Sequence, residues 1–128
     1  MAHFDDLRER ATDVVAPRQL SPSASCGTVG AALETVQGEV FVGVCVDTAS
    51  SLGFCAEHAA AAAMLTHGQN VVVRMVAVGA DHKVLAPCGR CREFILQLSP
   101  HNFDAEVLVN QTEVVRLGDL MPYRWPVD

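Results

Sequence analysis

The stretch Phe54-Cys55-Ala56-Glu57-His58 runs directly into five further alanines, and a second cysteine motif, Pro87-Cys88-Gly89-Arg90-Cys91, follows it along the chain. The two motifs together supply three thiols and one nearby carboxylate. Three cysteine ligands hold a zinc ion while leaving its fourth tetrahedral position open, as in catalytic rather than structural zinc sites. The pair of motifs therefore predicts a zinc centre formed by Cys55, Cys88 and Cys91.

Both motifs stand at the start of a predicted helix. Alanine has the highest helix propensity, so residues 55–67 are expected to be helical, with Gly68 as the residue that ends the helix. Residues 88–98 predict a second helix, which places Cys88 and Cys91 on one side of its first turn. The partial positive charge of a helix N-terminus favours thiolates. The two N-termini are therefore expected to point at one metal ion.

The remaining pattern alternates helices with strands. Apolar residues recur at helical spacing over residues 4–15, and β-rich or continuous apolar runs indicate strands elsewhere. The predicted strands cover residues 28–36, 40–46, 71–78 and 105–109, with short extended pieces at 83–86 and 113–117. This order predicts an α/β fold, a three-layer α/β/α sandwich with a central mixed five-stranded sheet. The length predicts that residues 1–128 form one domain.

The composition limits the class of partner and the compartment. The net charge of −6 argues against binding to nucleic acid, which requires several Lys or Arg residues on phosphates. Five cysteines without a secretion signal indicate a reducing compartment, so we expect a cytoplasmic protein. No apolar run reaches the length of a membrane span, so no membrane association is expected. A small molecule is the expected partner.

The chemistry of the predicted centre depends on Glu57. Zinc lowers the pKa of a bound water to roughly 7. Two residues past Cys55, the Glu57 carboxylate is expected to reach this water without binding the metal and to shuttle protons. Three thiolates carry excess negative charge, which Arg90 or His58 is expected to offset.

Simpler interpretations of the same residues remain open. Cys88 and Cys91 alone suit a redox pair, and Glu57 alone suits an acidic residue at a helix N-terminus. A structural zinc site requires a fourth protein ligand. The candidates are Cys26, Cys45, His58 and His67.

Taken together, the two motifs resemble those of the cytidine deaminase family, in the branch that acts on free nucleosides. This resemblance implies a zinc-dependent hydrolytic deaminase that converts a cytosine-type nucleoside to its uracil form and releases ammonia, usually as a homotetramer with active sites built across subunits. Cys55, Cys88 and Cys91 match the zinc ligands, and Glu57 matches the catalytic acid/base. Ala56 matches a residue whose main chain contacts the base.

The tail extends the resemblance. Arg90 and the Tyr123/Trp125 tail look closest to blasticidin S deaminase, so this cytosine nucleoside analogue joins cytidine and deoxycytidine among the expected substrates. Trp125 lies where the family often has an aromatic residue that reaches a neighbour's site; it equally suits a residue that anchors the tail on the core.

The substrate-binding positions depart from the family pattern. Gly27 replaces an aromatic residue, which removes a wall from the pocket. Cys45 and Asp47 replace the Asn and Glu that usually hold the ribose hydroxyls, and a thiol lacks the paired donor and acceptor of an amide. His58 stands where the family often has Arg. We therefore expect deamination with altered sugar recognition; the alternatives are a deaminase of a different aminated heterocycle or a non-catalytic zinc-stabilised binding protein.

Overall fold

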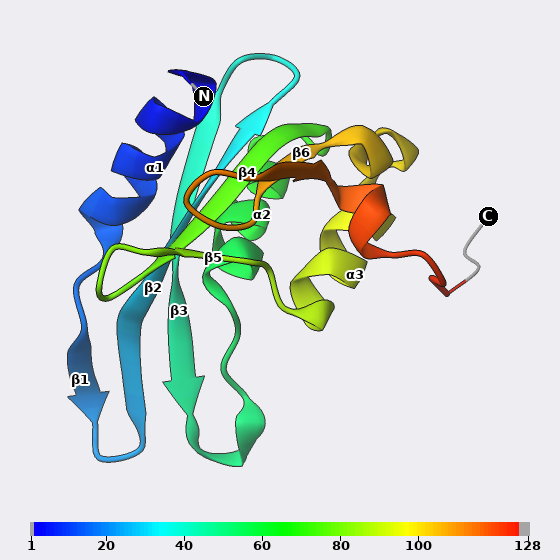
Figure 1. The fold of residues 1–128 in the computed structure, drawn as a ribbon. Helices are drawn as coiled ribbons and strands as arrows, with labels where there is room; N and C mark the ends of the chain where they lie inside the picture. Colours follow the sequence, from blue (N-terminus) through cyan, green and yellow to red (C-terminus); the bar gives the residue numbers. More distant parts are fainter. Residues whose placement is uncertain (1, 126–128) are drawn as a thin grey trace.

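The computed structural model describes residues 2–125 and shows helices on both faces of a central sheet (Figure 1). The helices are α1 (Ala2–Val14), α2 (Ala56–Thr66) and α3 (Gly89–Leu98), with short 3₁₀ turns at Ala49–Ser51, Pro100–Asp104 and Leu117–Leu120. The strands are β1 (Arg18–Ser21), β2 (Ala24–Thr35), β3 (Val40–Thr48), β4 (Val72–Gly79), β5 (Val84–Leu85), β6 (Glu106–Leu108) and β7 (Val114–Arg116). Within this described part of the chain, no helix is long and apolar enough to cross a membrane.

The sheet is mixed, as predicted. Strand β2 lies antiparallel to β1, β3 and β4, and β5 is also antiparallel to β4. The pairing of β4 with β6 is parallel, and β7 returns antiparallel to β6. The sheet therefore contains seven strands, so the predicted number of five was wrong.

Strand β1 was not predicted, whereas β5 and β7 lie within the short extended pieces predicted at residues 83–86 and 113–117. Strand β1 is exposed at every position and lies between two prolines, so it shows no alternation of buried and exposed residues. It forms because its backbone pairs with the start of β2, where Arg18 lies opposite Cys26. Strand β5 has only two residues, Val84 and Leu85. Backbone pairing, rather than burial of a face, defines such strands.

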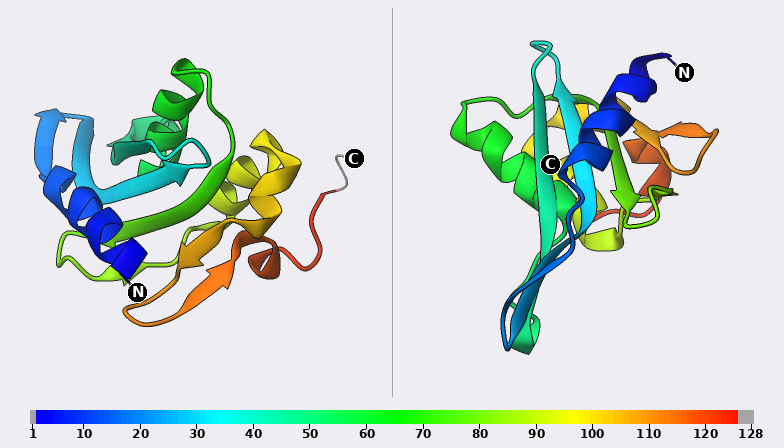
Figure 2. Two further views of the ribbon diagram at one scale, coloured as in Figure 1. Left: turned by 90° about the horizontal axis from the view of Figure 1, so that it is seen from above. Right: turned by 90° about the vertical axis from the view of Figure 1, so that its left-hand side faces the viewer.

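The three layers follow from residues that alternate across the sheet. Leu7 and Ala11 of α1 belong to one buried cluster, to which β2 contributes Ala32 and β4 contributes Val76. The next residue in β2, Leu33, belongs instead to the cluster that contains Met64 of α2 and Ile95 of α3. Figure 2 shows α1 and α2 on opposite sides of the sheet. The predicted three-layer α/β/α sandwich is therefore confirmed.

Helix α2 lies unusually close to β3 because small residues face each other across the contact. Ala56 and Ala60 are completely buried, and a Cβ at Gly43 would lie 2.5 Å from the Ala60 nitrogen and 2.8 Å from the Ala56 carbonyl oxygen. The alanine run thus supplies close packing as well as helix propensity. This contact fixes the position of the first turn of α2, which carries Cys55 and Glu57.

Replacing Gly43 with alanine is expected to destabilise the protein by about 1–3 kcal/mol, because the added methyl group must push α2 away from the sheet. Chemical denaturation measures this change. Gly68→Ala is a control for backbone strain without a clash, because a Cβ there meets no atom within 4 Å and its cost of about 1 kcal/mol comes from the left-handed φ of +78° alone. The prediction also requires weaker zinc binding in Gly43→Ala alone, because only that change displaces the start of α2.

Candidate active site

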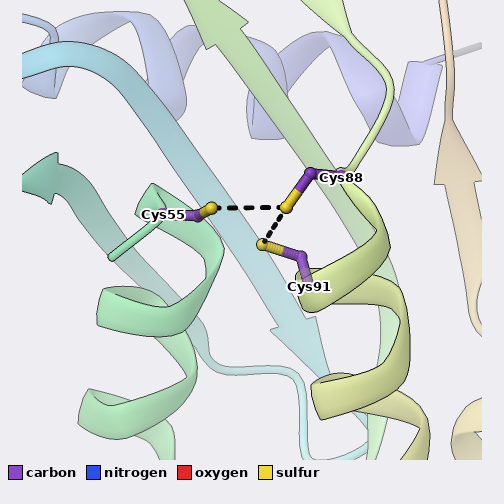
Figure 3. Close-up of side chains that lie close together, drawn as sticks. All are labelled: Cys55, Cys88 and Cys91. Atoms are coloured by element: carbon purple, nitrogen blue, oxygen red, sulfur yellow. Dashed lines mark hydrogen bonds between the residues drawn. The ribbon is translucent and has the colours of Figure 1, made fainter. Parts of the chain in front are cut away.

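Two helix N-termini bring the motif cysteines together (Figure 3). Cys55 has extended backbone and immediately precedes α2, and its carbonyl accepts hydrogen bonds from the N–H groups of His58 and Ala59. Cys88 occupies the corresponding position before α3, and Cys91 lies within the first turn of that helix. The predicted helix starts are therefore confirmed, and the sulfur atoms point toward one another.

The spacing of the three sulfurs suits a tetrahedral zinc ion. The Cys55 and Cys88 Sγ atoms are 3.3 Å apart, and those of Cys88 and Cys91 are 3.5 Å apart. All three lie within 4.8 Å of one another. Zinc–sulfur bonds of about 2.3 Å at tetrahedral angles place the sulfurs about 3.8 Å apart. Within residues 2–125, no further Cys, His, Asp or Glu joins this group, so the donor set matches a metal with one open position.

The electrostatics of the cluster also fit a cation. Burial raises the pKa of the Cys55 thiol, and burial followed by the charge of Glu57 raises the pKa of Cys91. Burial opposes ionisation of Cys88 too, but hydrogen bonds from the Cys91 backbone and from Cys55 hold its pKa below the usual value. Several acidic groups are thus crowded where their anionic forms repel one another. A divalent cation offsets this repulsion and binds the thiolate forms.

Glu57 lies in the first turn of α2, and its side chain is almost fully buried, with 4% of the residue exposed. Burial raises the pKa of its carboxyl group, which brings it closer to the range in which a carboxylate both accepts and donates protons. Glu57 lines the same cavity as Cys55 and Cys88. The chain thus combines a candidate proton carrier and a candidate metal centre on one cavity.

This cavity has a volume of about 590 Å³, within the usual range for small-molecule sites. Its wall comes from the sheet, from the loop before α2 and from the starts of α2 and α3. The lining residues are Thr28, Val29, Cys45, Val46, Asp47, Thr48, Ser51, Gly53, Phe54, Cys55, Ala56, Glu57, Ala77, Leu85, Ala86, Cys88 and Arg90. Three of the predicted substrate-binding residues, Ala56, Cys45 and Asp47, are among them.

The other two predicted substrate-binding residues do not line the cavity. Gly27 has a φ of +87°, and a Cβ there would lie 2.2 Å from the carbonyl oxygen of Ala16. A glycine is therefore required where β2 meets the segment after α1, and the neighbouring Thr28 faces the cavity instead. Trp125 is 70% exposed and stands away from the cavity in the single chain.

The two predicted charge-compensating residues differ in their contacts. The His58 Nδ1 atom lies 3.5 Å from the Cys91 Sγ, and the imidazole stacks on Phe94 with ring centroids 4.2 Å apart. Burial, followed by the charge of Arg90, lowers the pKa of His58. Arg90 also lines the cavity, but its guanidinium donates to the Gly53 carbonyl at 3.2 Å. His58 thus contacts one of the three clustered sulfurs directly. Sequence reasoning missed Phe94, although it follows Cys91 by one helical turn.

Comparison with known proteins places this chain in a family. No family model matches the chain. The cytidine deaminase of Mycobacterium tuberculosis is 32% identical over 123 residues, which cover 95% of this chain and 89% of that protein. The cytidine deaminase of Halalkalibacterium halodurans is 30% identical over 97 residues, which cover 73% of this chain and 74% of that protein.

Solved structures agree. The crystal structure of the Mycobacterium tuberculosis cytidine deaminase has a TM-score of 0.81 and 31% identity, and the match covers 97% of this chain and 98% of that chain. That of the Burkholderia pseudomallei cytidine deaminase has a TM-score of 0.77 and 34% identity, covering 98% of this chain and 100% of that chain. The chain therefore belongs to the cytidine deaminase family and is a hydrolase that acts on C–N bonds.

Proposed function

We propose that residues 1–128 form a single zinc-dependent deaminase domain that converts a cytosine-type nucleoside to its uracil form and releases ammonia. The observation that carries this proposal is a cluster of three cysteine sulfurs, of which Cys55 and Cys88 line the same cavity as the buried Glu57 carboxylate. Relatives named cytidine deaminase support a cytosine-type ring. Cytidine, deoxycytidine and the analogue blasticidin S are the proposed substrates.

Each residue of the site has a proposed role. Cys55, Cys88 and Cys91 hold the zinc ion, which when bound supplies a Lewis acid that makes water nucleophilic at neutral pH. Glu57 takes a proton from the attacking water and delivers it to the ring nitrogen beside the amine-bearing carbon. A second transfer by the same carboxyl group lets the amine leave as ammonia. The burial that raises the pKa of Glu57 makes its carboxylate a stronger acceptor for the proton of the water.

The substrate-binding and assembly roles are also proposals. The main chain of Ala56 is proposed to contact the base, and Asp47 to face the substituent on the ring.

We propose a homotetramer in which the exposed Trp125 reaches a neighbouring subunit. Native mass spectrometry measures the oligomeric state, and a Trp125→Ala variant that keeps its full kcat/KM contradicts a role at the active site.

An ammonia-release assay tests the proposed reaction. Purified protein loaded with zinc is compared on cytidine, 2′-deoxycytidine, 2′,3′-dideoxycytidine, blasticidin S and free cytosine. We expect turnover of at least one cytosine nucleoside and loss of turnover when a chelator removes the zinc. Release of ammonia from none of these compounds by protein that contains zinc would overturn the proposal.

Replacing His58 with alanine is expected to weaken zinc binding by about 10-fold to 100-fold, because groups that hydrogen-bond metal ligands typically contribute that much to affinity. The variant loses the contact of Nδ1 with the Cys91 sulfur and the stack on Phe94. Competition with a chromogenic chelator measures the zinc affinity.

A matched control for His58 is His101→Ala, which removes an exposed imidazole from the turn at Pro100–Asp104. This variant is expected to keep the zinc affinity of the unmodified protein. Equal affinity in the two variants would contradict the role assigned to His58.

A further inference from the structure

We propose that Cys45 determines substrate specificity by disfavouring a ribose diol. The preferred substrate is then an aminated pyrimidine whose sugar substituent lacks hydroxyl groups where it faces this thiol. This inference rests on the proposed deaminase function and adds the class of sugar to it.

Cys45 forms part of the cavity wall, which it shares with Cys55 and Glu57. The bridge between Val46 and Phe54 aligns this part of β3 with the residues that lead into α2. Cys45 is 7% exposed and belongs to one buried cluster with Ala31, Ala56 and Ala77. Small apolar residues therefore pack around Cys45 in the core, and one of them, Ala56, is the residue that follows Cys55.

The direction of the substrate follows from the chemistry of the ring. The amine-bearing carbon must lie at the cysteine cluster and Glu57, and the ring nitrogen that bears the sugar is on the opposite side of the ring. The sugar therefore extends away from the sulfurs along the cavity. Cys45 and Asp47 are two residues apart on one strand, so their side chains project from the same face, from Cα atoms about 6–7 Å apart. The antiparallel bridge places Cys45 nearer to α2 and Asp47 farther out, so the sugar passes the thiol first.

The Cys45 thiol itself offers little hydrogen bonding to a hydroxyl group. A thiol is a weak donor and a weak acceptor, and the Thr28 hydroxyl already lies 3.2 Å from the Cys45 sulfur. Asp47 Oδ2 is 4.0 Å from the same sulfur. No Asn or Gln is among the described residues that line the cavity. A sugar hydroxyl that faces the thiol exchanges its bonds to water for a weak bond to sulfur, and only a hydroxyl that reaches past the thiol can donate to the Asp47 carboxylate. A CH₂ group at the thiol packs against sulfur and methyl groups.

Relative kcat/KM values on four nucleosides test this inference. The compounds are cytidine, 2′-deoxycytidine, 3′-deoxycytidine and 2′,3′-dideoxycytidine, each assayed by ammonia release. We expect the unmodified protein to prefer the dideoxy compound over cytidine by roughly 10-fold to 100-fold, the range typical for an unpaired hydroxyl against an apolar wall. A preference for cytidine over the deoxygenated compounds would overturn the inference and leave the proposed function intact. Turnover of none of them would overturn both.

Substitution at Cys45 assigns the effect to this residue. Cys45→Asn, which supplies a donor and an acceptor, is expected to reverse the preference in favour of cytidine by at least about 10-fold. Cys45→Ser changes only sulfur to oxygen and is expected to shift the ratio in the same direction by less. The zinc content and melting temperature of each variant establish that it is folded. An unchanged cytidine-to-dideoxycytidine ratio in folded Cys45→Ser would overturn the role of Cys45, even where Cys45→Asn does not fold.

Discussion

Replacing Glu57 with glutamine is expected to lower kcat for ammonia release by at least about 10³-fold while leaving about one zinc ion bound per chain. The amide keeps the size of the side chain and its buried position in the first turn of α2. It cannot accept a proton from water or return one to the ring, so both transfers fail. Single-turnover kinetics measure the chemical step, and elemental analysis measures the zinc content.

The control for Glu57 is Glu9→Gln, which makes the same chemical change at an exposed position of α1. This variant should match the unmodified protein in both measurements. Glu57→Gln that retains a tenth or more of the activity would show that another group moves the protons. A variant that loses its zinc would instead indicate that the carboxylate holds the metal.

The features of the fold that the sequence predicted are those fixed by local rules. The alanine run and the following Gly68 defined α2 closely, because propensity and a left-handed terminal glycine act over a few residues. The helix that begins after Cys88 was equally predictable. Strand β1 was not, because its residues bury no face and depend on a partner strand for their conformation.

The same distinction applies to the site. The cysteine cluster was predictable because a zinc site needs several Cys or His ligands, and the spacing of the two motifs limits how the cysteines can meet. Contacts between distant segments were not: Thr28 meets Cys45 across β2 and β3, and no local pattern indicates that pairing. Gly27 was wrongly assigned to the substrate pocket. Its left-handed backbone and the close approach of Ala16 explain why a glycine stands there.

Replacing Cys91 with serine is expected to weaken zinc binding by at least about 10³-fold, because thiolate–zinc bonds supply most of a binding free energy of roughly 10–16 kcal/mol in sites of this kind. Cys91 is completely buried, and its sulfur lies 3.5 Å from that of Cys88. A serine hydroxyl does not ionise at neutral pH and is a poor zinc ligand. Activity should fall to background, and added zinc should no longer raise the melting temperature, since only a ligand that binds the native state stabilises it.

Cys26→Ser separates loss of a ligand from loss of a buried thiol. Cys26 is also buried, with 7% of the residue exposed, but it lies in β2 outside the metal cluster. Its replacement is expected to cost about 1–2 kcal/mol of stability, because a hydroxyl is buried in place of a thiol, and to leave the zinc affinity unchanged. Isothermal titration of zinc into the two metal-free variants measures the difference directly. Full zinc affinity in Cys91→Ser would mean that the cation is held elsewhere. A loss of zinc affinity in Cys26→Ser would extend the metal site beyond the three cysteines at the starts of α2 and α3.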